Sequence, residues 1–155
     1  MFRRHPVLSV LTVLYLAGVA WVTLGPEPYD AGTSGVLWRF LDFFARYEAT
    51  DWITFSRVEF TANIAMFIPL GIFFVLLFGR RRWWLAILLC GALSCGIEIW
   101  QGALLPTRVS DLADVIANTS GGAIGAVLGV VLMSISLARR GRQGRVRANA
   151  AHALG

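Results

Sequence analysis

Seven polar side chains lie within or at the ends of otherwise apolar stretches of the sequence, and these residues are the best candidates for chemistry. They are three amides, three carboxylates and one arginine: Asn63, Gln101, Asn118, Glu98, Asp111, Asp114 and Arg108. A charged side chain inside a membrane span costs about 2.5 to 3.5 kcal/mol on insertion scales, so each needs a partner or a task. Arg108 can offset part of the acidic excess by pairing with Glu98, Asp111 or Asp114.

Three interpretations of this polar cluster stay open: a structural lock that fixes helix register, a pocket for a polar or charged ligand, and a catalytic or metal site. The carboxylates Glu98, Asp111 and Asp114 have the chemistry of general acids, bases or Mg²⁺ ligands. No nucleophile with an obvious base partner accompanies them, because His5 and His152 lie in the termini. We therefore assign no catalytic residue, no metal and no cofactor, and we expect a protein that is not an enzyme.

Helical spacing predicts that the cluster residues share faces. Glu98 and Gln101 are three positions apart, which places both on one side of a helix. At about 100° per residue, Asp111, Asp114 and Asn118 fall within about 60° of one another. Asp111 also suits a helix N-cap, a role that fits Asp114 less well and Asn118 hardly at all. The sequence thus predicts two polar helix faces that meet.

Small and helix-bending residues lie beside the cluster: Pro69, Gly71, Gly121, Gly122, Gly125 and Gly129. Glycines four residues apart let a second helix come close, which we expect to clamp the last span into the bundle and bring Glu98 and Gln101 opposite it. Pro69 lacks a backbone donor and is expected to bend its helix. Such a bend either opens the end of the bundle or is a passive packing kink.

Composition predicts the elements that carry these residues. The chain has 155 residues, of which 57% are hydrophobic and 15% charged, with mean hydropathy +0.66. This balance favours a membrane protein over a soluble domain. Apolar runs predict an all-α membrane bundle of four transmembrane helices at about 7–24, 62–78, 83–105 and 110–137, forming one domain over 1–138. Residues 139–155 are predicted to be a basic, disordered, cytoplasmic tail.

The connection between the first two spans contains apolar residues at helical spacing over 36–47. They predict a short amphipathic helix that either lies at the lipid headgroups or packs over the mouth of the bundle. The first run has a basic start, like a signal peptide, but it exceeds the usual apolar length and we expect it to be retained. Cys90 and Cys95 are about 140° apart on one helix and are expected to be unpaired.

Arginine placement predicts orientation and argues against nucleic acid as a partner. The net charge of +5 arises without any lysine, and the arginines flank apolar runs. Ten of the 14 lie in the N-terminus, the middle loop and the tail, whereas four lie in the other two loops. The positive-inside rule then places both termini in the cytoplasm and the polar cluster toward the outside of a bacterial plasma membrane.

The ordered set of motifs resembles the VanZ-like family of bacterial membrane proteins, which is named for an accessory teicoplanin-resistance protein. The matching pieces are Asn63-Ile64-Ala65-Met66-Phe67-Ile68-Pro69-Leu70-Gly71, Glu98-Ile99-Trp100-Gln101, Arg108-Val109-Ser110-Asp111-Leu112-Ala113-Asp114, and Asn118-Thr119 with Gly121 and Gly122. The resemblance covers about 7–132. It implies a multi-pass plasma-membrane protein, linked in some members to lowered glycopeptide susceptibility, and it supplies no catalytic mechanism.

The leading functional hypothesis is a non-enzymatic, envelope-associated module whose outward-facing polar pocket binds an envelope lipid or a glycopeptide-like molecule. Two alternatives stay open. One is an intramembrane enzyme that acts on a lipid-linked phosphate or sugar. The other is a transporter accessory subunit or pore, which with four spans would require a homo-oligomer. The lipid bilayer is the partner common to all three.

Overall fold

The structure is a computed structural model that describes residues 6–24, 54–104 and 111–153. Every regular element in these ranges is helical: α1 (Pro6–Leu24), α3 (Phe55–Phe78), the 3₁₀ helix η3 (Arg80–Arg82), α4 (Trp83–Leu104) and α5 (Leu112–Ala153). The four α-helices are each long and apolar enough to cross a membrane. The prediction of an all-helical fold with four candidate spans is confirmed.

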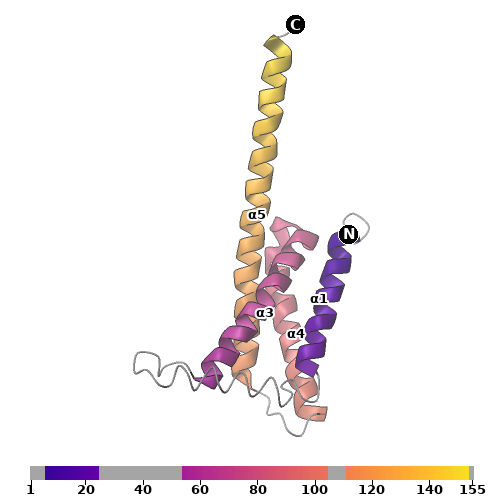
Figure 1. Cartoon of the computed structure of the whole chain (residues 1–155), viewed down its shortest axis with the longest axis vertical. Coiled ribbons are helices and arrows are strands. Elements are labelled where there is room, and N and C mark those ends of the chain that lie inside the picture. The colour runs from indigo at the N-terminus through magenta and orange to yellow at the C-terminus, as the bar shows by residue number, and fades with distance from the viewer. Residues whose placement is uncertain (1–5, 25–53, 105–110, 154–155) are drawn as a thin grey trace.

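Successive helices run in opposite directions, so the bundle has two distinct ends (Figure 1). At the lower end of Figure 1, α1 and α4 finish, and α3 and α5 begin. We call this the lower end. The opposite end carries the arginines of η3, the start of α1 and the continuation of α5. The beginning of the first helix and the finish of the last therefore point to the same side of the bundle.

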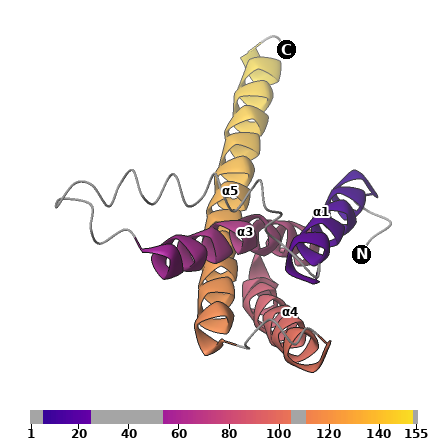
Figure 2. The same ribbon diagram turned by 60° about the horizontal axis from the view of Figure 1, so that its bottom comes forward.

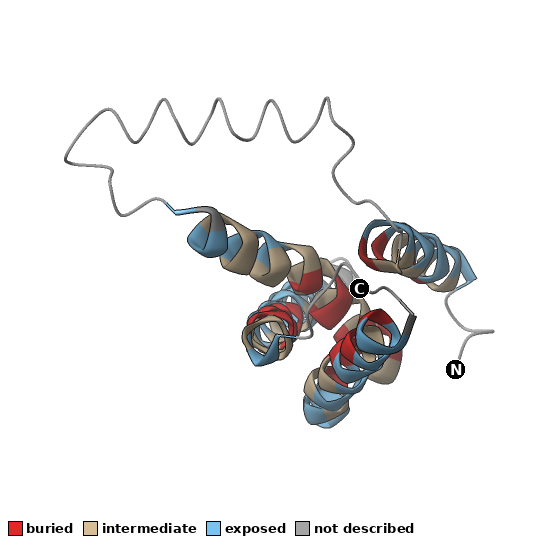
Figure 3. Ribbon diagram, turned by 90° about the horizontal axis from the view of Figure 1, so that it is seen from below, coloured by how far each residue is buried: buried red, intermediate tan, exposed pale blue. Residues whose placement is uncertain are grey.

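The core is built around α3, which crosses α5 and also packs against α1 and α4 (Figure 2). Phe67, Leu70 and Val75 of α3 are fully buried, together with Ala86 of α4 and Ala126 of α5. Buried residues face the centre of the bundle, as the view from below shows (Figure 3). The outer surface remains apolar, as expected for helices that face lipid tails.

A tight turn joins α3 to α4. Gly79 has a φ of 85°, in the left-handed region that favours glycine, and its N–H donates to the carbonyl of Val75 at 2.8 Å. Three arginines follow in η3, and then the exposed Trp83 and Trp84. Arginine and tryptophan side chains are favoured at a membrane interface. The turn therefore has the composition of a helix end that leaves the bilayer.

Two helix boundaries differ from the predicted ones. α3 begins seven residues before position 62, because Thr54 is extended and its carbonyl accepts from the N–H groups of Arg57 and Val58. α5 continues as a helix to Ala153, where disorder was predicted. The extension contains good helix formers, and no proline occurs after position 106. At 42 residues, α5 is about 63 Å long, twice the thickness of a bilayer core.

Two predictions concern residues outside the described ranges. The amphipathic helix expected at 36–47 lies in the connection between α1 and α3, and Arg108 lies in the connection between α4 and α5. Both stay predictions.

Candidate functional site

A cavity of about 130 Å³ opens at the lower end of the bundle. Five of the seven predicted cluster residues line it: Asn63, Glu98, Gln101, Asp114 and Asn118. Two further polar residues, Thr23 of α1 and Glu59 of α3, contribute to its wall. Glu59, Glu98 and Asp114 bring three carboxyl groups from three helices to one small space. We call this space the acidic cavity.

A hydrogen bond joins α3 to α5 at the acidic cavity. The Nδ2 atom of Asn63 donates to Oδ1 of Asp114 at 2.8 Å. Asp114 belongs to the first turn of α5, where a carboxylate also interacts favourably with the positive end of the helix dipole. The bond therefore connects two helices and places one carboxylate at a defined position in the wall.

The other two amides also donate to neighbouring helices. Gln101 Nε2 donates to the carbonyl oxygen of Thr23 at 2.7 Å, which ties α4 to α1. Asn118 Nδ2 donates to Oγ of Ser94 at 2.9 Å, which ties α5 to α4. Gln101, Asn118 and Ser94 are all buried. In each of the three cavity amides, the nitrogen atom therefore donates a hydrogen bond to another helix.

The oxygen side of Asn118 is different. Its Oδ1 is buried and has no hydrogen-bond partner among the residues that the structure describes, although the side chain is only 3% exposed and lines the acidic cavity. A buried acceptor without a partner costs about 1 to 3 kcal/mol. Such a group within a cavity is the feature expected where a ligand supplies the missing donor.

Asp111 belongs to the beginning of α5 and does not line the acidic cavity. Its Oδ1 accepts from the N–H of Ala113 at 2.8 Å, as an N-cap side chain does. Its own backbone N–H donates to Oε2 of Glu98 at 2.9 Å. Asp111 is exposed, whereas Glu98 is 8% exposed. The carboxylate of Glu98 thus holds the start of α5 against α4 and also lines the cavity.

Glu59 is the cavity residue that the sequence reasoning did not select. The predicted second span begins at 62, which leaves Glu59 in the connection before it. The structure includes it in α3, one turn before Asn63, and positions four residues apart lie on the same helix face. Its spacing from Asn63 was the signal available in the sequence.

The glycines of α5 let it approach α3 at backbone distance. A methyl group added to Gly121 would overlap the carbonyl of Ile64, and one added to Gly125 would overlap the carbonyl of Ile68. The helix brought closest by this stripe is therefore α3, whereas the sequence reasoning emphasised the span that carries Glu98 and Gln101.

Three more glycines make close contacts in the same region. A Cβ added to Gly122 would meet the side chain of Cys90, and one added to Gly129 would meet the side chain of Val75. A Cβ added to Gly71 would meet the backbone carbonyl of Gly122. Gly122 is thus the position at which α4 also comes close to α5. The acidic cavity lies at the end of this closely packed region.

Pro69 lies within α3, and a side chain of α1 bonds to the backbone of the turn before it. Tyr15 donates from its hydroxyl to the carbonyl of Met66, three residues before the proline, at 2.9 Å. Its ring packs edge-on against Phe73, with 5.7 Å between ring centroids. A proline in a membrane helix is tolerated where neighbours bond to the backbone groups that it leaves weakly paired. The carbonyl that loses its helical donor to Pro69 is that of Ala65, so Tyr15 bonds one residue along from it and attaches α1 to this turn of α3.

The polar side chains that line the acidic cavity are three carboxyl groups, three amides and the hydroxyl of Thr23. Among the residues that the structure describes, no group of three or more histidine, cysteine, aspartate or glutamate side chains is placed to hold a metal ion. The described residues that line the acidic cavity also include no cysteine, histidine or serine. The cavity therefore offers both hydrogen-bond acceptors and donors in a partly apolar setting.

A four-helix membrane bundle with a small acidic cavity at one end is the class of protein defined by these features. The sequence model of the VanZ/LLP1 family matches residues 12–133, so the chain belongs to this family of multi-pass membrane proteins. The match includes every residue that lines the acidic cavity. No curated protein and no solved structure matches the chain.

Proposed function

We propose that this protein is a non-enzymatic membrane module whose acidic cavity binds a polar group of an envelope component. The single observation that carries the proposal is the buried Oδ1 of Asn118, which has no partner within the described residues and belongs to the cavity wall. A purely structural lock gains nothing from a buried acceptor without a partner, since its cost lowers stability. A binding site recovers that cost when the ligand donates.

The proposed orientation places both termini in the cytoplasm and the acidic cavity toward the outside of the plasma membrane. Two observations support it. The three arginines of η3 lie at the end of the bundle opposite the cavity, and arginine is enriched on the cytoplasmic side of membrane proteins. The described start of α1 and the extension of α5 point to that same end. The cavity would then be accessible to envelope components from outside the cell.

The biological consequence that we propose is a change in susceptibility to glycopeptide antibiotics of the teicoplanin type, which act at the cell surface. The test expresses the chain in a teicoplanin-sensitive bacterial host and compares the wild type with Glu98→Gln and Asp114→Asn. Both substitutions remove a negative charge and keep an oxygen that can accept the observed hydrogen bond. Asp111→Asn removes a charge next to the cavity and serves as the matched control.

We expect the wild type and Asp111→Asn to shift susceptibility, and the two cavity variants to lose the shift at unchanged protein abundance in the membrane. Loss of abundance in both cavity variants would identify the cluster as a structural lock and end the binding proposal. A wild-type chain that leaves susceptibility unchanged would refute the link to glycopeptides.

A further inference from the structure

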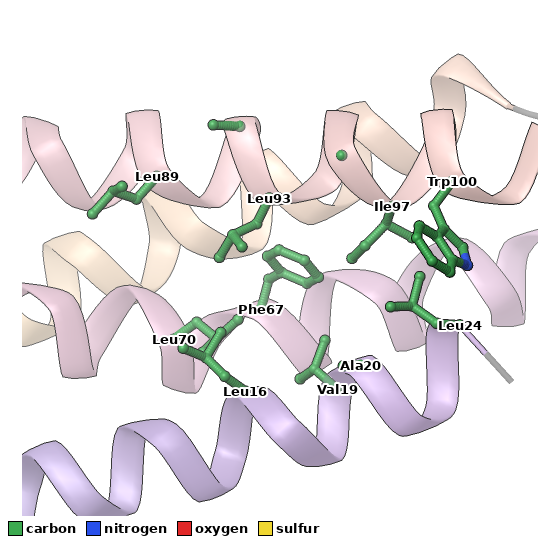
Figure 4. A pocket seen from close by; sticks show the side chains of 12 residues that line it. Leu16, Val19, Ala20, Leu24, Phe67, Leu70, Leu89, Leu93, Ile97 and Trp100 are labelled. Carbon is green, nitrogen blue, oxygen red and sulfur yellow. The ribbon is translucent and has the colours of Figure 1, made fainter. Parts of the chain in front are cut away.

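A second hollow, larger and apolar, lies beside the acidic cavity. It is a groove of about 410 Å³ between α1, α3 and α4, and we call it the apolar groove. Val19 of α1, Phe67 of α3 and Leu93 of α4 point into it (Figure 4). Its described lining contains no charged residue, so it offers nothing that distinguishes one lipid headgroup from another. Selection among headgroups requires charged side chains, and these lie at the two ends of the bundle.

Positive and negative charge are divided between the two ends. The described carboxyl groups all lie at the lower end, and they belong to Glu59, Glu98, Asp111 and Asp114. The opposite end, which we call the upper end, carries seven exposed arginines: Arg80, Arg81, Arg82, Arg139, Arg140, Arg142 and Arg145. We call these seven residues the basic cluster. In the described part of the chain, no acidic side chain at the upper end offsets their charge.

The two parts of the basic cluster, on η3 and on α5, lie close together. α3 and α5 run in the same direction, and Gly129 of α5 lies against Val75 of α3. Counted from this contact at 1.5 Å per residue, Arg80 is about 8 Å and Arg139 about 15 Å further toward the upper end. η3 also lies beside α5. The arginines therefore form one basic region at the end of the bundle.

The surrounding residues place this region at a membrane interface. Leu137 ends the apolar run of α5, and Arg139 follows two residues later. Trp83 and Trp84 follow η3 directly and are exposed, as is typical of residues at headgroup level. The headgroup region is about 5 to 8 Å deep on each side of a bilayer, and the helix from Arg139 to Arg142 covers about 5 Å. These arginines thus lie at the depth of lipid phosphates.

The arginines of α5 also repel one another. Arg139 and Arg142, and likewise Arg142 and Arg145, are three residues apart, so like charges share a helix face and destabilise it. The two glycines between them further disfavour a helix, and both have open space around them, so neither serves close packing. No carboxylate follows Asp114 in the sequence. An external anion would remove the repulsion within this part of α5.

We infer that the basic cluster binds the phosphate headgroups of anionic phospholipids in the leaflet at the upper end of the bundle. Guanidinium groups bind phosphate oxygens through charge-assisted, bidentate hydrogen bonds. The depth of the cluster selects lipid over a soluble polyanion such as RNA, because the arginines nearest the bundle are level with the headgroups. This surface lies at the end opposite the acidic cavity, and the inference does not depend on what the cavity binds.

The test measures lipid binding to the purified full-length chain in detergent by native mass spectrometry. The probes are phosphatidylglycerol and phosphatidylcholine with identical acyl chains, glycerol phosphate alone, and a short RNA. Phosphatidylglycerol is anionic, whereas choline neutralises the phosphate of phosphatidylcholine. We expect phosphatidylglycerol to bind about tenfold more tightly than phosphatidylcholine, and this preference should fall at high ionic strength. Glycerol phosphate and RNA should bind more weakly than phosphatidylglycerol.

Matched variants locate the site. The triple variant Arg139→Gln/Arg140→Gln/Arg142→Gln should lower the preference to less than about threefold. The corresponding triple lysine variant keeps the positive charge, including the charge that orients the chain in the membrane, and should retain the preference. Arg57→Gln removes an arginine at the lower end and should leave lipid binding unchanged. If the triple glutamine variant does not accumulate, Arg139→Gln and Arg142→Gln alone should each weaken phosphatidylglycerol binding by about two- to fivefold.

Equal binding of the two lipids by the wild type would overturn the inference and leave the arginines as a signal for orientation only. A preference that survives unchanged in the glutamine variants would also overturn it, as would glycerol phosphate or RNA binding as tight as that of phosphatidylglycerol. These outcomes differ from failure of the proposed function. If the lipid preference is absent but Glu98→Gln and Asp114→Asn still abolish the susceptibility shift at normal abundance, only the assignment of the basic cluster is wrong.

Discussion

The substitution Asn118→Leu distinguishes a binding site from a structural lock, because the two roles predict opposite changes in stability. Asn118 has one hydrogen bond, to Ser94, and one buried oxygen without a partner in the described part of the chain. Leucine has a similar shape and no polar atoms. The variant therefore loses a bond and also loses the cost of the unpaired oxygen.

The magnitudes follow from these two terms. The lost hydrogen bond contributes about 0.5 to 1.5 kcal/mol, and in membrane proteins about 0.6 kcal/mol on average. The unpaired carbonyl costs about 1 to 3 kcal/mol. Ser94 can turn its hydroxyl toward the backbone carbonyl one turn earlier, so it need not stay unpaired. We expect the unliganded variant to lie between unchanged and about 2 kcal/mol more stable than the wild type.

Ligand binding should change in the opposite direction. Loss of an acceptor for a ligand donor costs about 0.5 to 1.5 kcal/mol, which weakens binding by about 2- to 13-fold. The assay pairs an unfolding titration of the purified chain with the susceptibility shift that the same variant confers on the host. A fall in unfolding free energy of more than about 1 kcal/mol in Asn118→Leu would refute the reasoning and support a lock.

Ser94→Ala is the matched counterpart, because it leaves the buried amide nitrogen of Asn118 without its partner. We expect this variant to be destabilised by about 1 to 3 kcal/mol. Adding Asn118→Leu to it should restore stability, because the pair is then apolar on both sides. A double-mutant cycle that shows simple additivity would contradict the observed contact between the two side chains.

Three further predictions concern packing and topology. Gly125→Ala should destabilise the bundle by more than about 2 kcal/mol, since its methyl group overlaps the carbonyl of Ile68. Gly141→Ala on the same helix has open space and should be neutral or slightly stabilising. Equal unfolding free energies for the two variants would contradict the close approach of α5 to α3. Tyr15→Phe should lower the unfolding free energy by about 0.5 to 1.5 kcal/mol through loss of its bond before Pro69, and a zero effect would mean that α1 is held by apolar packing alone. Reporter fusions at the two termini should both indicate a cytoplasmic location, and opposite readings would exclude four crossings.

The four spans were predictable because their signal is local. A run of apolar residues long enough to cross a bilayer has few alternatives, and the breaks at Gly25-Pro26, Gly79 and Pro106 coincide with helix ends or with connections outside the described residues. The boundaries were less predictable. Composition alone did not distinguish the polar first turns of α3 from a loop, or the basic end of α5 from a disordered tail, because propensity is a weak signal at polar positions.

The residues of the candidate site were predictable for a different reason. Polar side chains are expensive in an apolar span, so their presence alone selected Asn63, Glu98, Gln101, Asp114 and Asn118, all of which line one cavity. The sequence did not reveal which atoms pair with which. It also missed Glu59, whose helix was expected to begin after it, and the groove, whose apolar residues resemble every other lipid-facing residue of the chain.

The choice between a lock and a pocket could not be settled from residue types because each amide has two ends. The nitrogen of Asn63 bonds to α5, that of Gln101 to α1 and that of Asn118 to α4, so the donor ends hold the helices in register. The oxygen of Asn118 has no partner within the described residues and lies in the cavity wall, next to three carboxyl groups. Fixing the helices and presenting an acceptor to a ligand are therefore two consequences of one arrangement. A substitution that keeps the amide N–H donor and removes the oxygen acceptor, or the reverse, distinguishes fixing of the helices from ligand binding.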